Sequence, residues 1–247
     1  MSPMSLPTAW MLAMLRFTPL LMVPAMTPFS WAPVPVRAVL LITLSVLLVA
    51  VMPAVAEPVS LFVACISELV TGACFGLAVM LPMAALSLPA RLLDLQAGLA
   101  SASLFNPAVQ GTDSLLGTLL SLAGTLVFFA GGFHLLVLRG LVASARLMPL
   151  GGLARSASLD TLLGLLGSQF VLGLMVVLPV VLGLFVIDVF VAIASRSMPQ
   201  ANVYFLALPL KVVAMLVLLA ASLRLAPALI GRLFQDALTR SASLVGT

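Results

Sequence analysis

Residues 161–187, TLLGLLGSQFVLGLMVVLPVVLGLFVI, decide the fold class of this chain, because they contain no charged side chain. A helix needs about 20 mostly apolar residues to cross the hydrocarbon core of a bilayer. Further charge-free runs occupy residues 38–56, 69–90 and 114–138. We therefore expect an all-α integral membrane protein with about six apolar helices, several of them kinked or broken.

The composition excludes most other classes of protein. Of the 247 residues, 63% are hydrophobic and only 7% are charged, whereas soluble domains carry about a quarter charged residues. The net charge of +4 comes from scattered arginines, and no basic cluster is interleaved with aromatic residues, so we expect no nucleic-acid partner. His134 is the only histidine, which leaves no His-based metal cluster and no Ser-His-Asp triad. Lys211, the only lysine, lacks the glycines of a phosphate-binding loop. We expect no enzyme, cofactor or metal, and membrane lipid as the surroundings.

Apolar periodicity and the prolines predict the order of the elements. The expected apolar helices lie near residues 6–30, 37–55, 59–90, 114–143, 159–194 and 201–223, and an amphipathic helix follows at 225–241. Prolines punctuate the first of these helices, which we expect to be kinked or split. No polar segment is long enough for a separate soluble domain, so residues 1–247 form a single polytopic membrane domain.

The segment 91–114, RLLDLQAGLASASLFNPAVQGTDS, is a polar break between two apolar runs. Inside a membrane such a segment is tolerated only where it is buried in protein or lines a cavity. An ordinary connection outside the bilayer is the alternative. We expect a helix over 91–105, because the residue before Pro107 avoids the helical conformation. Asp113 or Ser114 is then the N-cap of the next helix.

Charged residues inside apolar helices need partners, because their burial is costly. Arg91 and Asp94 are three residues apart and can pair on one helix face. Asp188 and Lys211 lie at similar distances from the turn between them, so an antiparallel hairpin would bring them together. That pair either fixes the hairpin register or couples to protons. Glu68 is expected to reach an arginine or an open helix end.

Small residues recur with helical spacing along two predicted helices. Such stripes allow helix backbones to approach closely in lipid. They serve either packing within this chain or packing against other subunits. The two stripes comprise Glu68, Gly72 and Gly76 on one helix, and Gly117, Gly124 and Gly131 on the other.

Six short motifs together resemble one known family. LDLQAGL at 93–99, followed by FNP at 105–107, resembles the central motif of the FliR family of flagellar export-gate proteins, and the type III secretion relatives of that family share the pattern. The residues of this central motif are Arg91, Asp94, Gln96 and Gly98. The other matching motifs are PVPVR at 33–37, ELVTG at 68–72, MPLGG at 148–152, SRSMPQANVYF at 195–205 and LPLK at 208–211.

The resemblance implies a non-enzymatic gate subunit of the flagellar type III export apparatus. Such a subunit passes unfolded flagellar proteins across the bacterial inner membrane, in the flagellar basal body. Its expected partners are FliP-like and FliQ-like subunits in a helical assembly, together with FlhB and FlhA. Residues 1–150 would be the FliP-like part, and 159–247 the FliQ-like hairpin and tail.

The resemblance also implies roles for two sets of residues. The loop after the central motif would help to plug the closed channel, and it comprises Phe105, Asn106, Pro107, Ala108, Val109, Gln110, Gly111, Thr112, Asp113 and Ser114. The hairpin with its turn and ion pair comprises Asp188, Arg196, Pro199, Gln200, Asn202 and Lys211. Two alternatives stay open: an export-gate homologue of virulence type III secretion, and a stand-alone proton- or solute-coupled transporter that uses Asp188, Lys211 and Glu68.

Overall fold

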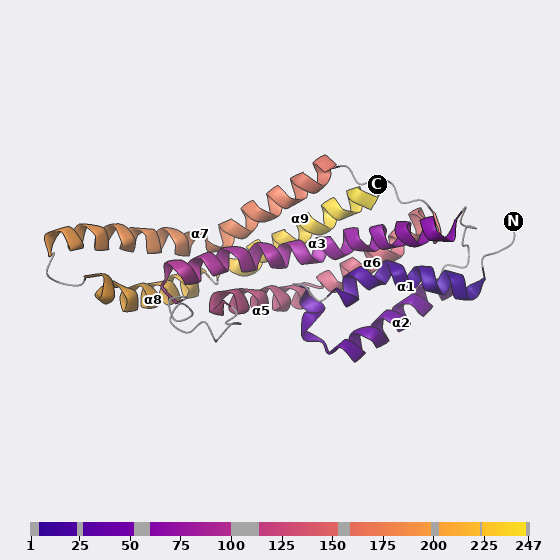
Figure 1. Cartoon of the computed structure of the whole chain (residues 1–247), viewed down its shortest axis with the longest axis horizontal. Coiled ribbons are helices and arrows are strands. Elements are labelled where there is room, and N and C mark those ends of the chain that lie inside the picture. Colours follow the sequence, from indigo (N-terminus) through magenta and orange to yellow (C-terminus); the bar gives the residue numbers. More distant parts are fainter. Residues whose placement is uncertain are drawn as a thin grey trace. The chain divides into compact units, whose positions relative to one another are not determined.

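The computed structural model describes residues 5–23, 27–51, 60–99, 114–152, 159–198, 203–222 and 224–245, and all regular elements within these ranges are helices (Figure 1). The all-α prediction is confirmed. The elements are α1 (Leu6–Met22), the 3-10 helix η1 (Pro28–Trp31), α2 (Val34–Val51), α3 (Leu61–Gln96), α5 (Leu115–Ala130), α6 (Phe133–Leu147), α7 (Leu159–Ser197), α8 (Val203–Ser222) and α9 (Ala226–Val245).

Several helices have the length and composition that a bilayer requires. Within the described ranges, three helices pass this test on their own: α2, α3 and α7. The number rises to five if the pairs α5–α6 and α8–α9 each count as one broken span. The exterior is also apolar, since large side chains such as Phe62 and Phe190 are each 74% exposed. The chain is therefore a membrane-embedded helical protein.

Two predicted helix boundaries are wrong. The apolar run 114–143 forms two helices, because Gly132 has a φ of +70° and interrupts the helical backbone between α5 and α6. Gly131 therefore lies beyond the end of α5 and does not share a helix with Gly117 and Gly124. Of the helix predicted over 91–105, residues 91–96 are the last part of α3, which ends at Gln96, and residues 100–105 lie outside the described residues.

The chain divides into two compact units, which we describe separately. Unit 1 comprises Met1–Met83, Phe128–Gln169 and Phe234–Thr247, and unit 2 comprises Ala84–Val127 and Phe170–Leu233. Both units draw on early and late parts of the chain, so neither coincides with the predicted division near residue 150. That predicted FliP-like and FliQ-like division stays a prediction.

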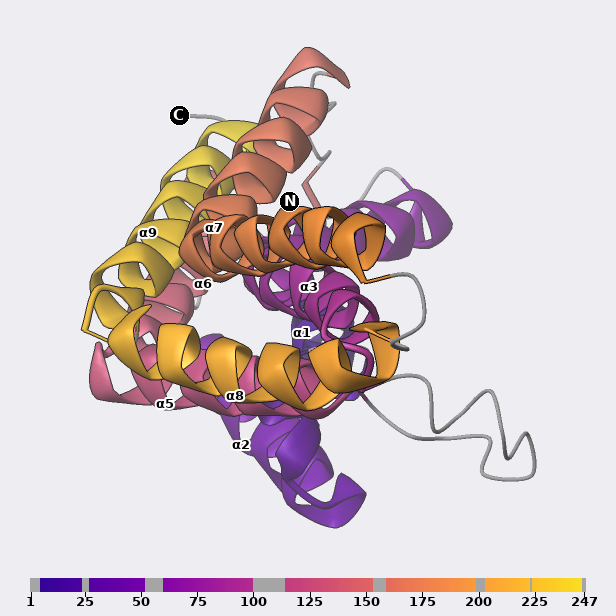
Figure 2. The same cartoon turned by 90° about the vertical axis from the view of Figure 1, so that its left-hand side faces the viewer.

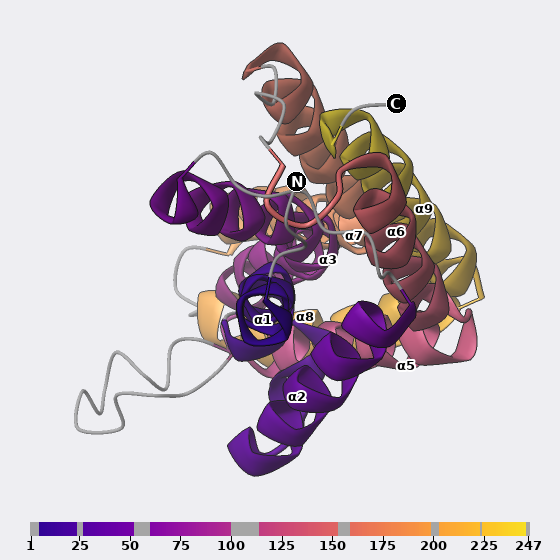
Figure 3. The same cartoon turned by 90° about the vertical axis from the view of Figure 1, so that its right-hand side faces the viewer.

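Unit 1 has its core between α1, α2, α6 and the first part of α3. Helices α1 and α2 lie side by side (Figures 1 and 3), and Trp10 Nε1 donates a hydrogen bond to Ser45 Oγ at 3.1 Å. Proline at the first turn of α1 suits the start of a helix, where its missing N–H is not needed. In the same unit, Phe29 packs edge-to-face on Phe128 with ring centroids 5.8 Å apart.

Unit 2 contains an antiparallel hairpin made from the second part of α7 and from α8 (Figures 1 and 2). At Gly183 of α7, the methyl groups of Leu218 of α8 fill the space that a Cβ would occupy. Gly173 in the same helix faces the backbone carbonyl of Ala85, on the last part of α3, so a Cβ there would collide with backbone atoms. The small residue at Gly173 thus allows α7 and α3 to approach closely within unit 2.

Candidate functional site

The central motif lies at the end of α3, where a capping motif terminates the helix. Gly98 has a φ of +81°, a left-handed conformation that glycine adopts without strain. Its N–H donates to the carbonyl of Leu95 at 3.1 Å, and the N–H of Leu99 donates to the carbonyl of Asp94 at 2.9 Å. These two bonds define a Schellman motif, which satisfies the carbonyl groups at a helix C-terminus.

The next helix within the described residues, α5, begins with a cap that involves the same aspartate. The hydroxyl of Ser114 accepts a hydrogen bond from the N–H of Gly117 at 2.8 Å, as an N-cap residue does. That hydroxyl in turn donates to the carboxylate of Asp94. The N–H of Leu116 donates to the same carboxylate, with its nitrogen 3.3 Å from Asp94 Oδ2 and 3.4 Å from Oδ1. A carboxylate at a helix N-terminus is also favoured by the helix dipole.

A single residue, Asp94, therefore holds both ends of the polar segment in unit 2. Its backbone carbonyl binds Leu99, and its side chain, which is only 4% exposed, binds Ser114. The expected pairing of Asp94 with Arg91 is wrong: the Asp94 carboxylate faces α5, and Arg91 is exposed. Gln96 is the last residue of α3 and is partly exposed.

The α7–α8 hairpin of unit 2 brings Asp188 and Lys211 together. The ammonium group of Lys211 forms an ion pair with Asp188, and the Lys211 side chain is 11% exposed against 36% for Asp188. Arg196 is exposed near the end of α7. The ion pair links α7 and α8 at a point distant from the turn that connects them. A contact in this position fixes which residues of the two helices lie opposite each other in the hairpin. The role of these residues in gating stays a prediction.

Unit 1 contains a fully buried ion pair between Arg16 of α1 and Glu68 of α3, each 1% exposed. Arg16 Nε donates to Glu68 Oε2 at 2.5 Å, and Arg16 Nη2 donates to Glu68 Oε1 at 3.1 Å. Such a two-point contact is the strongest form of an arginine–carboxylate pair.

The same pair holds the backbone of the MPLGG motif, which follows α6. Arg16 Nη2 donates to the carbonyl of Met148 at 3.1 Å, and the N–H of Gly151 donates to Glu68 Oε1 at 3.0 Å. Next to Glu68, the hydroxyl of Ser67 donates to the carbonyl of Gly152 at 2.6 Å. Two motifs 80 residues apart in the sequence thus belong to one buried network.

The stripe formed by Gly72 and Gly76 on α3 packs within this chain. A Cβ at Gly72 would collide with the backbone carbonyl of Arg16, and a Cβ at Gly76 would lie 3.4 Å from the carbonyl oxygen of Pro19. This stripe therefore allows the backbones of α1 and α3 to approach closely. On α5, Gly117 lies against the capping hydroxyl of Ser114.

Other predicted site residues lie outside the described residues. They are Phe105, Asn106, Pro107, Ala108, Val109, Gln110, Gly111, Thr112 and Asp113 of the loop, and Pro199, Gln200 and Asn202 of the hairpin turn. Of the ten loop residues, Ser114 is the one that the structure describes, as the N-cap of α5.

A family comparison places this arrangement in a known context. The model of the family described as bacterial export proteins, family 1, matches residues 8–237. The chain belongs to this family. The resemblance to FliR proteins that the six motifs indicate is confirmed, and it extends over nearly the whole length of this export protein.

Individual relatives of this export protein are flagellar biosynthetic proteins and a Yop protein translocation protein. It is 30% identical over 179 residues to the flagellar biosynthetic protein FliR of Aquifex aeolicus, which covers 72% of this chain and 69% of that protein. It is 28% identical over 164 residues to FliR of Caulobacter vibrioides, covering 65% and 64%. It is 29% identical over 147 residues to the Yop proteins translocation protein T of Yersinia pestis, covering 58% and 56%. The alignments thus span between about half and about two thirds of these relatives.

Arg16 is the residue of this export protein that sequence reasoning missed. It is the only charged residue in the first 36 positions, and an isolated charge in an apolar helix needs a buried partner. That signal identifies Arg16 as a residue that requires a carboxylate, although it does not identify which one.

Proposed function

We propose that this export protein is a non-enzymatic gate subunit of a type III protein export apparatus in the bacterial inner membrane. It belongs to the flagellar basal body and passes unfolded flagellar proteins. FliP-like and FliQ-like subunits, FlhB and FlhA are its proposed partners. Family membership supports a role in export, and the FliR relatives support the flagellar system.

The observation that carries the gating role is the double anchor at Asp94. The two described residues that flank the segment 100–113 are Leu99 and Ser114, and both are bonded to Asp94. A segment with both ends held at one rigid point can project from the helices without altering how they pack. We place the plug in residues 105–114, which end at the anchored Ser114.

The proposed mechanism is steric. The polar segment closes a narrow passage between packed helices, and it moves aside when a substrate and the energised apparatus arrive. The anchor supplies a fixed base for this movement, since the caps of α3 and α5 share one residue: the backbone carbonyl of Asp94 binds the α3 cap, and its carboxylate binds the α5 cap. No covalent chemistry is needed in this mechanism.

The two alternative functions have less support. The Yersinia relative is the support for a virulence system, and its alignment covers 58% of this chain against 72% for the Aquifex FliR. A proton-coupled transporter needs an acidic group that can exchange its proton. Glu68 is buried against Arg16, and Asp188 is paired with Lys211, so each of these acids already has a cationic partner.

Deletion of residues 110–113 tests the gating role. In cells that carry the complete export apparatus, we expect this deletion to let small ions leak across the inner membrane while the assembly still forms. The measurement is ion conductance, together with copurification of the FliP-like and FliQ-like subunits. A replacement of 110–113 by Gly-Ser-Gly-Ser is the control for length. An unchanged conductance in the assembled deletion variant would overturn the gating role.

A further inference from the structure

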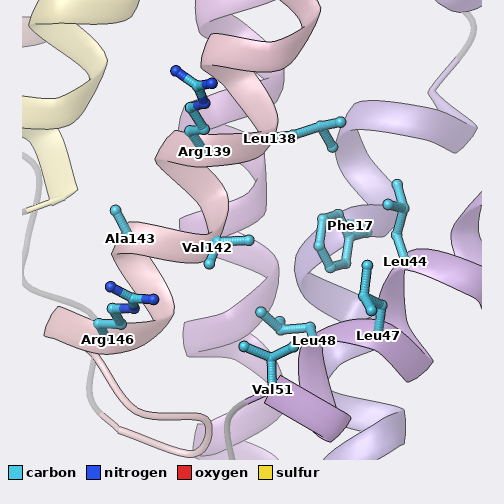
Figure 4. A pocket seen from close by; sticks show the side chains of 10 residues that line it. All are labelled: Phe17, Leu44, Leu47, Leu48, Val51, Leu138, Arg139, Val142, Ala143 and Arg146. Carbon is cyan, nitrogen blue, oxygen red and sulfur yellow. The ribbon is translucent and has the colours of Figure 1, made fainter.

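An apolar pocket lies in unit 1 between α2 and α6, and it plays no part in the network around Arg16 (Figure 4). Its volume is about 440 Å³, within the range of about 300–1,000 Å³ that is usual for ligand sites. Eight of its ten lining residues are apolar: Phe17, Leu44, Leu47, Leu48, Val51, Leu138, Val142 and Ala143.

The remaining two lining residues, Arg139 and Arg146, lie along one edge of α6 with Ala143 between them (Figure 4). Their spacing of seven residues is two helical turns, or about 10 Å along the helix axis. Both are exposed, and neither has a hydrogen bond or an ion pair to another residue in the described part of the chain. The pocket therefore combines an aliphatic lining with two uncompensated positive charges and no acidic residue.

We infer that this pocket binds an anionic phospholipid. An acyl chain occupies the aliphatic part between Phe17, Leu48 and Val142, and the phosphate of the headgroup lies against Arg139 or Arg146. Guanidinium groups bind phosphate through charge-assisted hydrogen bonds. Arginine side chains are also long enough to keep the charged group in the headgroup region while their stems cover apolar surface.

The position of the pocket favours lipid over a helix of another protein. One wall is α2, a candidate membrane span of which only 22% is buried inside the structure, so this wall faces the surroundings of unit 1. A protein partner would have to bring carboxylates into apolar surroundings to match the two arginines, which is costly. A phospholipid carries its anion and its apolar tail in one molecule. This inference does not depend on the gating role.

Lipid retention by the purified full-length chain tests the inference. The chain is equilibrated with phosphatidylglycerol or with phosphatidylcholine in the same detergent, and bound lipid is counted by native mass spectrometry. We expect phosphatidylglycerol to be retained preferentially. The double variant Arg139→Gln/Arg146→Gln should retain about tenfold less, because each basic residue contributes to the attraction of anionic lipid. The charge-matched variant Arg224→Gln/Arg232→Gln, altered at two exposed arginines elsewhere, should retain it as the wild type does.

A second variant tests the apolar part of the pocket. Val142→Trp, at the α6 side chain that points toward Phe17 and Leu48 (Figure 4), should fill the pocket and reduce retention of phosphatidylglycerol, whereas Ala130→Trp, at the exposed end of α5, should not. Equal retention of the two lipids, or equal retention by all variants, would overturn the inference. So would a photo-crosslinker at residue 142 that captures another subunit of the assembled apparatus instead of lipid.

Discussion

At the scale of the residue, the buried Arg16–Glu68 pair gives the strongest expectation. We expect Glu68→Ala to reduce the free energy of unfolding by about 3–5 kcal/mol, because it leaves the Arg16 guanidinium buried without its counter-charge. The double variant Arg16→Met/Glu68→Met should recover much of that loss. Thermal unfolding of the purified chain in detergent measures both. As a control, Arg240→Gln removes an exposed pair with Asp236 and should cost less than about 1 kcal/mol.

If the double variant is no more stable than Glu68→Ala, the attraction between Arg16 and Glu68 stabilises the fold by more than the burial of the two charges costs. The sequence predicts part of this site, since the cost of a charge in an apolar helix means that Glu68 reaches either an arginine or an open helix end, and the structure shows an arginine. The identity of that partner depends on how α1 packs on α3. Contacts between residues 52 positions apart follow from tertiary packing, which no local pattern encodes.

The Asp94–Ser114 anchor gives a second expectation for single residues. Ser114→Ala and Asp94→Ala should each destabilise the chain by about 1 kcal/mol, as the loss of a helix cap does. Because the two side chains act on the same helix end, the double variant should cost less than the sum. Ser121→Ala is the matched control, since that hydroxyl bonds within its own helix. Additive costs would mean that the two residues act independently.

At the scale of the element, Gly98 and Gly167 should respond in opposite ways to alanine. Gly98→Ala places a side chain in a left-handed conformation, which costs about 1–2 kcal/mol, and its Cβ would lie 2.6 Å from Leu208 Cδ2. Gly167 is helical in α7, with no atom near its Cβ position, so Gly167→Ala should stabilise the helix by up to about 1 kcal/mol. The melting temperatures of the two variants should lie on opposite sides of the wild type. A Gly98→Ala variant as stable as Gly167→Ala would contradict this account of the α3 cap.

The helices themselves were predictable to different degrees. Long charge-free runs place α2 and α7 to within a few residues, because apolar length is a strong signal in membranes, whereas α3 continues past its predicted end at residue 90 to Gln96. The N-cap at Ser114 was one of two predicted candidates, and the hydroxyl geometry selects it. The break at Gly132 was missed, since a glycine within an apolar run is tolerated inside membrane helices. Its left-handed conformation is visible only in the folded chain.

At the scale of the whole molecule, composition predicts a membrane protein and motif order predicts the family. Neither predicts the division into two units, because both units combine segments that are distant in the sequence. The lipid pocket was also beyond the sequence. Arg139 and Arg146 are visible there as two scattered charges, and only the packing of α6 beside α2 gives them a shared apolar cavity.

The exposed apolar side chains lead to an expectation about assembly, which rests on the proposed function. Large side chains such as Phe62 in unit 1, and Leu126 and Phe190 in unit 2, are between 69% and 74% exposed in this chain, and exposed apolar surface is where lipid or partner subunits bind. If FliP-like and FliQ-like subunits cover part of this surface, they bind the folded chain and not the unfolded one. Mass action then stabilises the chain by about 2.7 kcal/mol when a partner is present at 100 times its dissociation constant.

We therefore expect the melting temperature of the chain in a fixed detergent to rise with the concentration of these subunits, and to stay constant when an unrelated helical membrane protein is added. A melting temperature that does not respond to the FliP-like and FliQ-like subunits would leave lipid as the cover of this surface and would contradict the proposed partners.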